Sequence, residues 1–228
     1  MKKIKVLKVV FDQRIAAWQV PKFRGAIIEK INREGLLFHN HMGDDKFRYA
    51  YPLIQYKTFN GNAGFICIEE GTEEVHAFFS KNNWNINLEG REMQLSIKSL
   101  SANHFNLQTW DTWFYYTLNN WIALNKENYD RYKCLEGAVE RLQFLERILT
   151  GNILSFSKGV GLMVDEPIKL EILEVVREKK VEHKGISLIG FNLDFRSNFF
   201  LPNHIGLGKG VSTGFGVVRE KRKSRQEK

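Results

Sequence analysis

The residues best suited to chemistry gather in one segment of about twenty residues, between His39 and Lys57. Two histidines, three tyrosines and three cationic side chains lie in it: His39, His41, Tyr49, Tyr51, Tyr56, Lys46, Arg48 and Lys57. RNA can be cleaved without a metal ion when a base takes the proton of its own 2′-hydroxyl and an acid protonates the leaving 5′-oxygen. Histidine suits either step because its pKa lies near neutrality, and a lysine or arginine can offset charge in the transition state.

His41 is our first candidate for the acid or base, and His39 is the second. The alternative is that both are solvated loop residues. A zinc site is a weak interpretation, because two histidines separated by one residue have no cysteine or third histidine near them. The sequence therefore predicts neither a metal nor a cofactor.

The cations of this segment are candidates for charge stabilisation. Lys46 or Lys57 would stabilise the transition state, and Arg48 would contact an RNA phosphate; an ordinary charged strand edge is the alternative for each. Tyr51 could orient a histidine or stack on a base, whereas core packing is the more common role of a strand tyrosine.

A second segment of interest is Gly206–Gly216, which has the sequence GLGKGVSTGFG. Glycine has no Cβ, so backbone N–H groups in such a loop can approach a phosphate closely. The segment is not a Walker loop, because Lys209 is followed by glycine instead of serine or threonine. We expect RNA contacts from Lys209, Ser212 and the five glycines, Gly206, Gly208, Gly210, Gly214 and Gly216. The alternative is a tight connection whose glycines only supply a positive φ.

The glycine spacing resembles the C-terminal signature of the repeat-associated (RAMP) superfamily of RNA-binding proteins in CRISPR systems. That signature is Gly-apolar-Gly, five residues and Gly-apolar-Gly, which Gly206–Gly208 and Gly214–Gly216 fit without a gap. Within the superfamily, the chain is similar to the endoribonucleases that cut precursor CRISPR RNA inside each repeat. In those enzymes a catalytic histidine commonly follows the first helix, which is where His39 and His41 lie in this chain.

The resemblance implies an α+β fold of two tandem ferredoxin-like (RRM-like) βαββαβ domains, with antiparallel sheets and helices on one face. It implies a metal-independent transesterification that leaves a 2′,3′-cyclic phosphate or 3′-phosphate and a 5′-hydroxyl. The expected partner is CRISPR repeat RNA, as precursor or product, and other subunits of a CRISPR effector complex are further candidates. The sequence leaves homodimerisation open.

Composition agrees with a folded RNA-binding protein without establishing it. The chain has 228 residues, 43% of them hydrophobic, and a net charge of +8. Residues 217–228 have six basic and two acidic residues, so half of the charge is in this tail. The two cysteines, Cys67 and Cys134, suggest no disulfide framework and indicate a reducing cytoplasm. No apolar run approaches the roughly 20 residues of a membrane span, so we expect no membrane association.

The first half of the chain has the order of elements of a ferredoxin-like domain. We expect a helix that begins at Pro21 and ends near Gly35. The other expected elements are strands at 3–11, 47–57, 64–69 and 84–99, and a helix at 73–81. The segment 99–104 is the candidate boundary. It divides the chain into an N-terminal domain at 1–99, a C-terminal domain at 105–218 and a basic tail at 219–228, which we expect to be disordered.

The second half is expected to form a more degraded copy of the same domain. We expect an aromatic strand region at 105–124, a helix at 135–150 that Gly151 and Asn152 end, strands at 168–178 and 186–196, and a last strand near Val218. The aromatic residues between Trp110 and Trp121 favour a buried sheet, and a base-stacking platform is the alternative.

Two functions compete with the nuclease. One is a non-catalytic subunit that binds CRISPR RNA in an effector complex, and the other is a general single-stranded RNA-binding protein. The pair His39 and His41 favours the enzyme.

Overall fold

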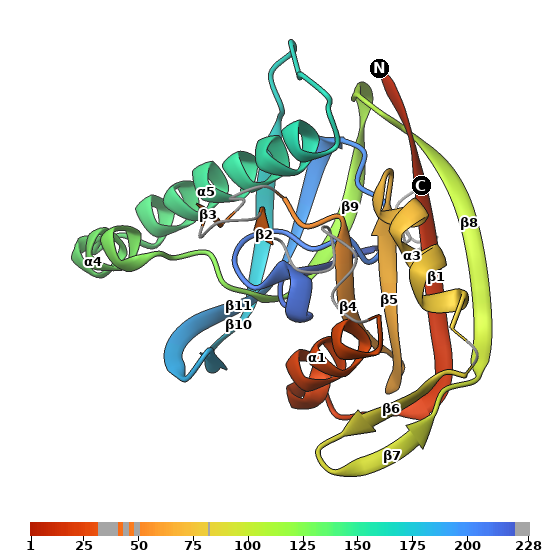
Figure 1. Ribbon diagram of the computed structural model, residues 1–228. Helices are drawn as coiled ribbons and strands as arrows, with labels where there is room; N and C mark the ends of the chain where they lie inside the picture. Colours follow the sequence, from red (N-terminus) through yellow and green to blue (C-terminus); the bar gives the residue numbers. More distant parts are fainter. Residues whose placement is uncertain (32–40, 43–45, 48–50, 82, 222–228) are drawn as a thin grey trace. The chain divides into compact units, whose positions relative to one another are not determined.

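The computed structural model describes residues 1–31, 41–42, 46–47, 51–81 and 83–221 (Figure 1). It divides into two compact units. The N-terminal unit contains Lys3–Phe105 together with Ser212–Gly214, and the C-terminal unit contains most of the remaining described chain, chiefly Asn106–Val211. The predicted tail at 219–228 lies outside the described residues from residue 222 onward.

The N-terminal unit has one four-stranded sheet in the order β4-β5-β1-β8. The strands are β1 (Lys2–Arg14), β4 (Ile54–Phe59), β5 (Asn62–Ile68) and β8 (Ile97–Leu107), and the helices are α1 (Val20–Lys30) and α3 (Gly71–Phe79). β1 and β4 both pair antiparallel with β5. The unit also contains η1 (Ala17–Gln19) and the short strands β2 (His41–Met42), β3 (Lys46–Phe47), β6 (Asn85–Leu88) and β7 (Arg91–Gln94). This strand order is the ferredoxin-like one.

Aromatic rings hold α1 and α3 against the sheet of this unit. Phe11 of β1 lies edge-on to Phe23 of α1, Phe65 of β5 and Phe78 of α3, with ring centroids 5.8–6.1 Å apart. Edge-to-face pairs at this separation add to the free energy of burial. Figure 1 shows both helices over the same sheet, so the apolar face of each helix and the inner face of the sheet form one core.

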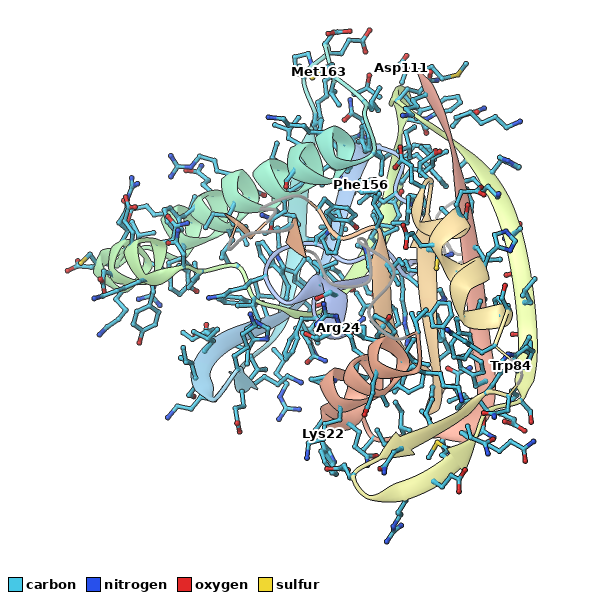
Figure 2. The ribbon with its side chains drawn as sticks, viewed as in Figure 1. Lys22, Arg24, Trp84, Asp111, Phe156 and Met163 are labelled. Atoms are coloured by element: carbon cyan, nitrogen blue, oxygen red, sulfur yellow. The ribbon has the colours of Figure 1, made fainter. Side chains whose placement is uncertain are left out.

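The C-terminal unit repeats this strand order as β10-β11-β9-β12. The elements are β9 (Thr109–Trp121), α4 (Lys126–Cys134), α5 (Ala138–Gly159), β10 (Leu170–His183), β11 (Ile186–Phe199), η2 (Val211–Thr213) and β12 (Val217–Glu220). Tyr116 and Phe195 face each other across β9 and β11, and Trp121 packs on Phe191. Figure 2 labels Phe156 on the last turns of α5, where the ring is buried, and Met163 beyond the helix, where the side chain is exposed.

The α+β fold with two antiparallel sheets is confirmed. The predicted strand at 47–57 is confirmed from Ile54 onward, but its predicted start is wrong, because Tyr51–Leu53 form no strand. Pro52 explains the late start, since a proline cannot donate a ladder hydrogen bond. α1 ends at Lys30, before the predicted end at Gly35, which is outside the described residues. The segment 99–104 lies inside β8.

The predicted end of the helix at 135–150 is also wrong. α5 passes through Gly151 and Asn152 and continues to Gly159. The buried stripe of Leu149 continues at Ile153 and Phe156, and this burial outweighs the cost of about 1 kcal/mol for one helical glycine. The sequence analysis missed α4, whose start is marked by Asn125: its side chain accepts a hydrogen bond from the N–H of Asn128.

Within the part of the chain that the structure describes, no helix is both long enough and apolar enough to cross a membrane.

Candidate functional site

The predicted histidine segment is described only in part. β2 and β3 form an antiparallel pair in which His41 is opposite Phe47 and Met42 is opposite Lys46. This pairing brings the backbones of His41 and Lys46 into one two-stranded ladder. His39 and Arg48, also predicted for this site, lie outside the described residues.

Lys57 of β4 and Tyr51, which precedes β4, belong to one chain of hydrogen bonds. The Lys57 ammonium donates to Gln55 Oε1 at 3.1 Å, and Gln55 Nε2 donates to the Tyr51 hydroxyl at 2.8 Å and to the Pro52 carbonyl at 3.0 Å. Gln55 is completely buried, and Lys57 is only 2% exposed. The structure therefore connects two of the predicted catalytic residues through Gln55, which the sequence analysis did not identify.

Burial changes the chemistry of Lys57. Removing the ammonium from water lowers the pKa of Lys57 from 10.5 to about 7. A lysine with this pKa exchanges its proton near neutrality, so it can act as a proton donor or acceptor as well as a cation. The sequence pattern contained one indication of this environment: Gln55 and Lys57 alternate with the apolar residues Ile54 and Tyr56 in a strand, which places both polar side chains on one face.

The glycine-rich segment uses much of its backbone to bind the C-terminal sheet. The Lys209 N–H donates to the Ile122 carbonyl at 3.1 Å and the Gly216 N–H to the Asn120 carbonyl at 3.0 Å. Leu207 and Phe215 donate to Gly216 and Gly210 within the segment. These four N–H groups are therefore bound by the protein's own carbonyls and are not directed at a phosphate.

Two of the glycines are required by close packing. A Cβ at Gly216 would overlap the Leu207 carbonyl oxygen, and one at Gly208 would lie 2.6 Å from Trp121 Nε1. Both residues also have a positive φ, a conformation that side chains with a Cβ rarely adopt. The predicted alternative, a tight connection that needs glycine for its backbone, therefore has direct geometric support, while the exposed side chain of Lys209 remains available for a ligand.

The tip of the segment, Ser212–Gly214, is part of the N-terminal unit. A Cβ at Gly214 would lie 3.5 Å from the Tyr56 carbonyl oxygen and 3.8 Å from Lys57 Cα. The structure thus brings Gly214 beside Tyr56 and Lys57 of β4. Gly206 and Gly210 lie in the C-terminal unit, where Gly206 is next to Val211 and Gly210 is next to Phe215 and His183.

The described residues contain no group of three or more histidine, cysteine, aspartate or glutamate side chains placed to hold a metal ion.

The two sheets share the ferredoxin-like strand order, and a glycine-rich connection precedes the last strand, which is the architecture of the RAMP superfamily of CRISPR proteins. Family models describe the same two halves: that of the Cas6b N-terminal domain matches residues 2–106, and that of the Cas6b C-terminal domain matches residues 108–221. The chain belongs to the Cas6b family.

Solved structures agree with this assignment. A crystal structure of Cas6b is 28% identical, with a TM-score of 0.87, and another described as the CRISPR RNA processing endoribonuclease Cas6b is 26% identical, with a TM-score of 0.74. Each match covers 96% of this chain and all of the other chain. An uncharacterized protein of Methanocaldococcus jannaschii is 44% identical over 104 residues, which are 46% of this chain and 69% of that protein. The prediction of a CRISPR endoribonuclease is confirmed at the level of the family.

Proposed function

We propose that the chain cleaves precursor CRISPR RNA within its repeats, without a metal ion, by attack of a 2′-hydroxyl. The match of both halves to Cas6b supports this function. The 2′-oxygen forms a bond to the adjacent phosphorus and the bond from phosphorus to the 5′-oxygen breaks. The products are a 2′,3′-cyclic phosphate, which can open to a 3′-phosphate, and a 5′-hydroxyl.

His41 is the proposed acid or base, and His39 is the second candidate. The base takes the proton of the 2′-hydroxyl, and the acid gives a proton to the leaving 5′-oxygen. Lys46, which shares the β2–β3 ladder with His41, offsets the negative charge of the phosphorane.

Lys57 and Tyr51 have supporting roles in this proposal. The pKa of Lys57, about 7, allows it to supply either a charge or a proton at neutral pH. Gln55 links Lys57 to the Tyr51 hydroxyl, so Tyr51 is proposed to orient the histidine segment that precedes it in the chain.

The RNA backbone is proposed to contact Lys209, Ser212 and Arg48, with the glycines Gly206, Gly208, Gly210, Gly214 and Gly216 shaping the loop. The position of Gly214 beside Lys57 supports an RNA path near β4. Binding to other CRISPR subunits and homodimerisation stay predictions.

A cleavage assay in EDTA tests the proposal. Purified protein is mixed with synthetic repeat RNA, and with the same RNA carrying one 2′-deoxy nucleotide at the cut site. We expect one discrete cut in EDTA, no cut in the deoxy RNA, and a rate about 10²–10⁴-fold lower for His41→Ala.

The other outcomes have defined meanings. Loss of cleavage in His39→Ala instead would move the acid or base by two positions and keep the mechanism. Cleavage that requires a divalent metal would contradict the mechanism. Tight binding without any cut would favour the non-catalytic subunit.

A further inference from the structure

A cavity in the C-terminal unit lies outside the catalytic residues discussed above. Its volume is about 480 Å³, and it is lined by the start of α4, by the hairpin of β10 and β11, and by the glycine-rich segment. These three segments are far apart in the sequence. Ligand pockets in proteins commonly have volumes of about 300–1,000 Å³, so the cavity can accommodate a molecule the size of a nucleotide.

The walls of this cavity combine apolar groups with positive charge. Leu124 and Ile186 provide apolar surface, and Ile186 is 58% exposed although it is a large aliphatic side chain. Lys126, Lys180 and Lys209 line the same space, each from a different segment. None of the described lining residues is acidic, so three positive charges surround an apolar interior.

Tyr129 of α4 supplies an aromatic ring to this cavity. It is 38% exposed, and the Lys133 ammonium lies 5.4 Å from the centre of the ring. Lys133, one turn further along α4, can restrict the ring through a cation–π contact. Aromatic rings that remain accessible beside lysines are the usual platform on which single-stranded nucleic acids stack their bases.

His183 lies beside the glycine-rich segment that supplies Lys209 to the cavity. His183, at the end of β10, is 5.3 Å from Phe215, ring centre to ring centre. Burial and the nearby charges of Lys184 and Lys209 lower the pKa of His183, as expected where cations cluster. The four glutamates of β10 do not line the cavity. One of them, Glu178, accepts a hydrogen bond from the Tyr132 hydroxyl.

We infer that this cavity binds one unpaired nucleotide of the RNA substrate, with the base on Tyr129 and the adjoining phosphates on Lys126, Lys180 and Lys209. The inference rests on the proposed function, because it assumes that RNA is the substrate. An apolar interior suits the face of a base, and three lysines suit its phosphates. A paired nucleotide does not fit this role, since its base is already stacked within a duplex.

Binding to a fluorescein-labelled uridine decamer in EDTA tests the inference. We expect Tyr129→Leu, which keeps apolar volume but removes the aromatic face, to weaken binding roughly tenfold or more. Tyr129→Phe keeps the ring and should bind within about twofold of the wild type. Lys126→Ala and Lys180→Ala should each lower the dependence of log K on log salt by about 0.7.

Lys158→Ala is the matched control for the lysine variants. Lys158 is exposed in the last turn of α5, so its replacement removes one charge outside the cavity. It should change binding less than Lys126→Ala or Lys180→Ala does. Equal losses in all three lysine variants would show a general charge effect and overturn the inference.

Crosslinking gives a second measurement that needs no variant. A decamer containing 4-thiouridine is irradiated with the wild-type protein, and the crosslinked peptides are identified by mass spectrometry. We expect crosslinks to the peptide that contains Lys126 and Tyr129. Crosslinks only elsewhere, or no binding of the decamer by the wild type, would overturn the inference.

The inference and the proposed function can fail separately. If repeat RNA is not cut but decamer binding depends on Tyr129, the nuclease proposal fails and the nucleotide site stands. If repeat RNA is cut while Tyr129→Leu and Lys180→Ala bind the decamer as the wild type does, the nucleotide site is wrong and the nuclease proposal stands.

Discussion

The two units have the same strand order, but they connect the last pair of strands differently. In the N-terminal unit, α3 lies between β5 and the last sheet strand, β8, and buries Val75 and Phe78 in the core. In the C-terminal unit, the described connection from β11 to β12 contains the single 3₁₀ turn η2 and the glycine-rich segment in place of an α-helix. Backbone hydrogen bonds, not an apolar helix face, attach that segment to β9.

This difference shows how one position of the fold can be filled by an apolar helix in one unit and by a glycine-rich connection in the other. A helix satisfies its own backbone groups and must bury an apolar face. The glycine-rich segment satisfies four N–H groups through the Asn120 and Ile122 carbonyls and through two carbonyls of its own, and the side chain of Lys209 is exposed. The Lys209 side chain can therefore contact a ligand while hydrogen bonds hold the Lys209 backbone in place.

Replacement of Gly216 should have the largest effect on stability. The Cβ of Gly216→Ala would overlap the Leu207 carbonyl oxygen in a backbone with a φ of +62°. We expect a loss of about 4 kcal/mol or more, because both the clash and the backbone conformation oppose alanine. Urea unfolding with a tryptophan fluorescence readout measures the loss.

Gly90→Ala in the N-terminal unit is the control. Gly90 has a φ of +82°, but a Cβ there would meet nothing within 4 Å. Only the conformational cost of about 1–2 kcal/mol applies. Equal losses for the two variants would mean that the glycine-rich segment is not packed more closely than an ordinary turn.

Lys57→Met should stabilise the N-terminal unit at and below neutral pH. The pKa of Lys57 is lowered from 10.5 to about 7, so between these values the unfolded chain holds a proton that the folded chain lacks. The free energy of unfolding of the wild type therefore rises with pH across this window, and the full cost of the buried charge applies below pH 7.

We expect Lys57→Met to be more stable than the wild type by about 2–4 kcal/mol at pH 6, with the difference shrinking toward pH 10.5. Urea unfolding of both proteins from pH 6 to pH 10 measures it. A difference that stays constant with pH would show that Lys57 keeps its ordinary pKa. Cleavage assays on the same variant test the proposed role of Lys57 independently.

Asn152→Ala should destabilise the C-terminal unit by about 1–3 kcal/mol. Asn152 Oδ1 accepts a hydrogen bond of 2.9 Å from Nε1 of Trp121, which is fully buried, and the variant leaves that donor without its acceptor. The neighbouring change Gly151→Ala is the control: a Cβ there meets nothing within 4 Å. It should raise stability by about 0.5–1 kcal/mol because residue 151 is helical. A loss in Gly151→Ala would contradict the continuous helix.

The smallest effects are expected at two tyrosines that occupy buried positions in the two sheets. Among the described residues, the Tyr56 hydroxyl has no hydrogen-bond partner, whereas the Tyr116 hydroxyl accepts a bond of 2.8 Å from the Leu201 N–H. Tyr56→Phe should therefore leave stability unchanged or raise it by up to about 1 kcal/mol, and Tyr116→Phe should lower it by about 1 kcal/mol. Chemical denaturation of both variants distinguishes the two cases, and a matching loss in both would indicate a partner for Tyr56.

Most of the first unit could be predicted from local patterns. Pro21 and the apolar spacing after it predicted α1, and the strand predicted at 64–69 corresponds to β5. A predicted helix end was wrong where burial in the core outweighed the tendency of glycine to end a helix. Gly151 does not end α5, because Ile153 and Phe156 continue the buried face of the helix. The α4 helix was missed because its sequence is mostly polar and only Tyr132 is buried.

The sequence by itself determined the class of protein, because the two Gly-apolar-Gly groups lie within eleven consecutive residues and their spacing can be read directly. It also indicated that residues 39–57 contain the acid, base and cation types for RNA cleavage. Only the tertiary structure decided that Lys57 is buried against Gln55, that N–H groups of the glycine-rich segment donate to the protein's own carbonyls, and that Tyr129 and Lys209 line one cavity. The physical reason is that burial, pKa and cavity shape depend on residues far apart in the chain, whereas a local sequence pattern reflects only the backbone preference and the exposed face of each element.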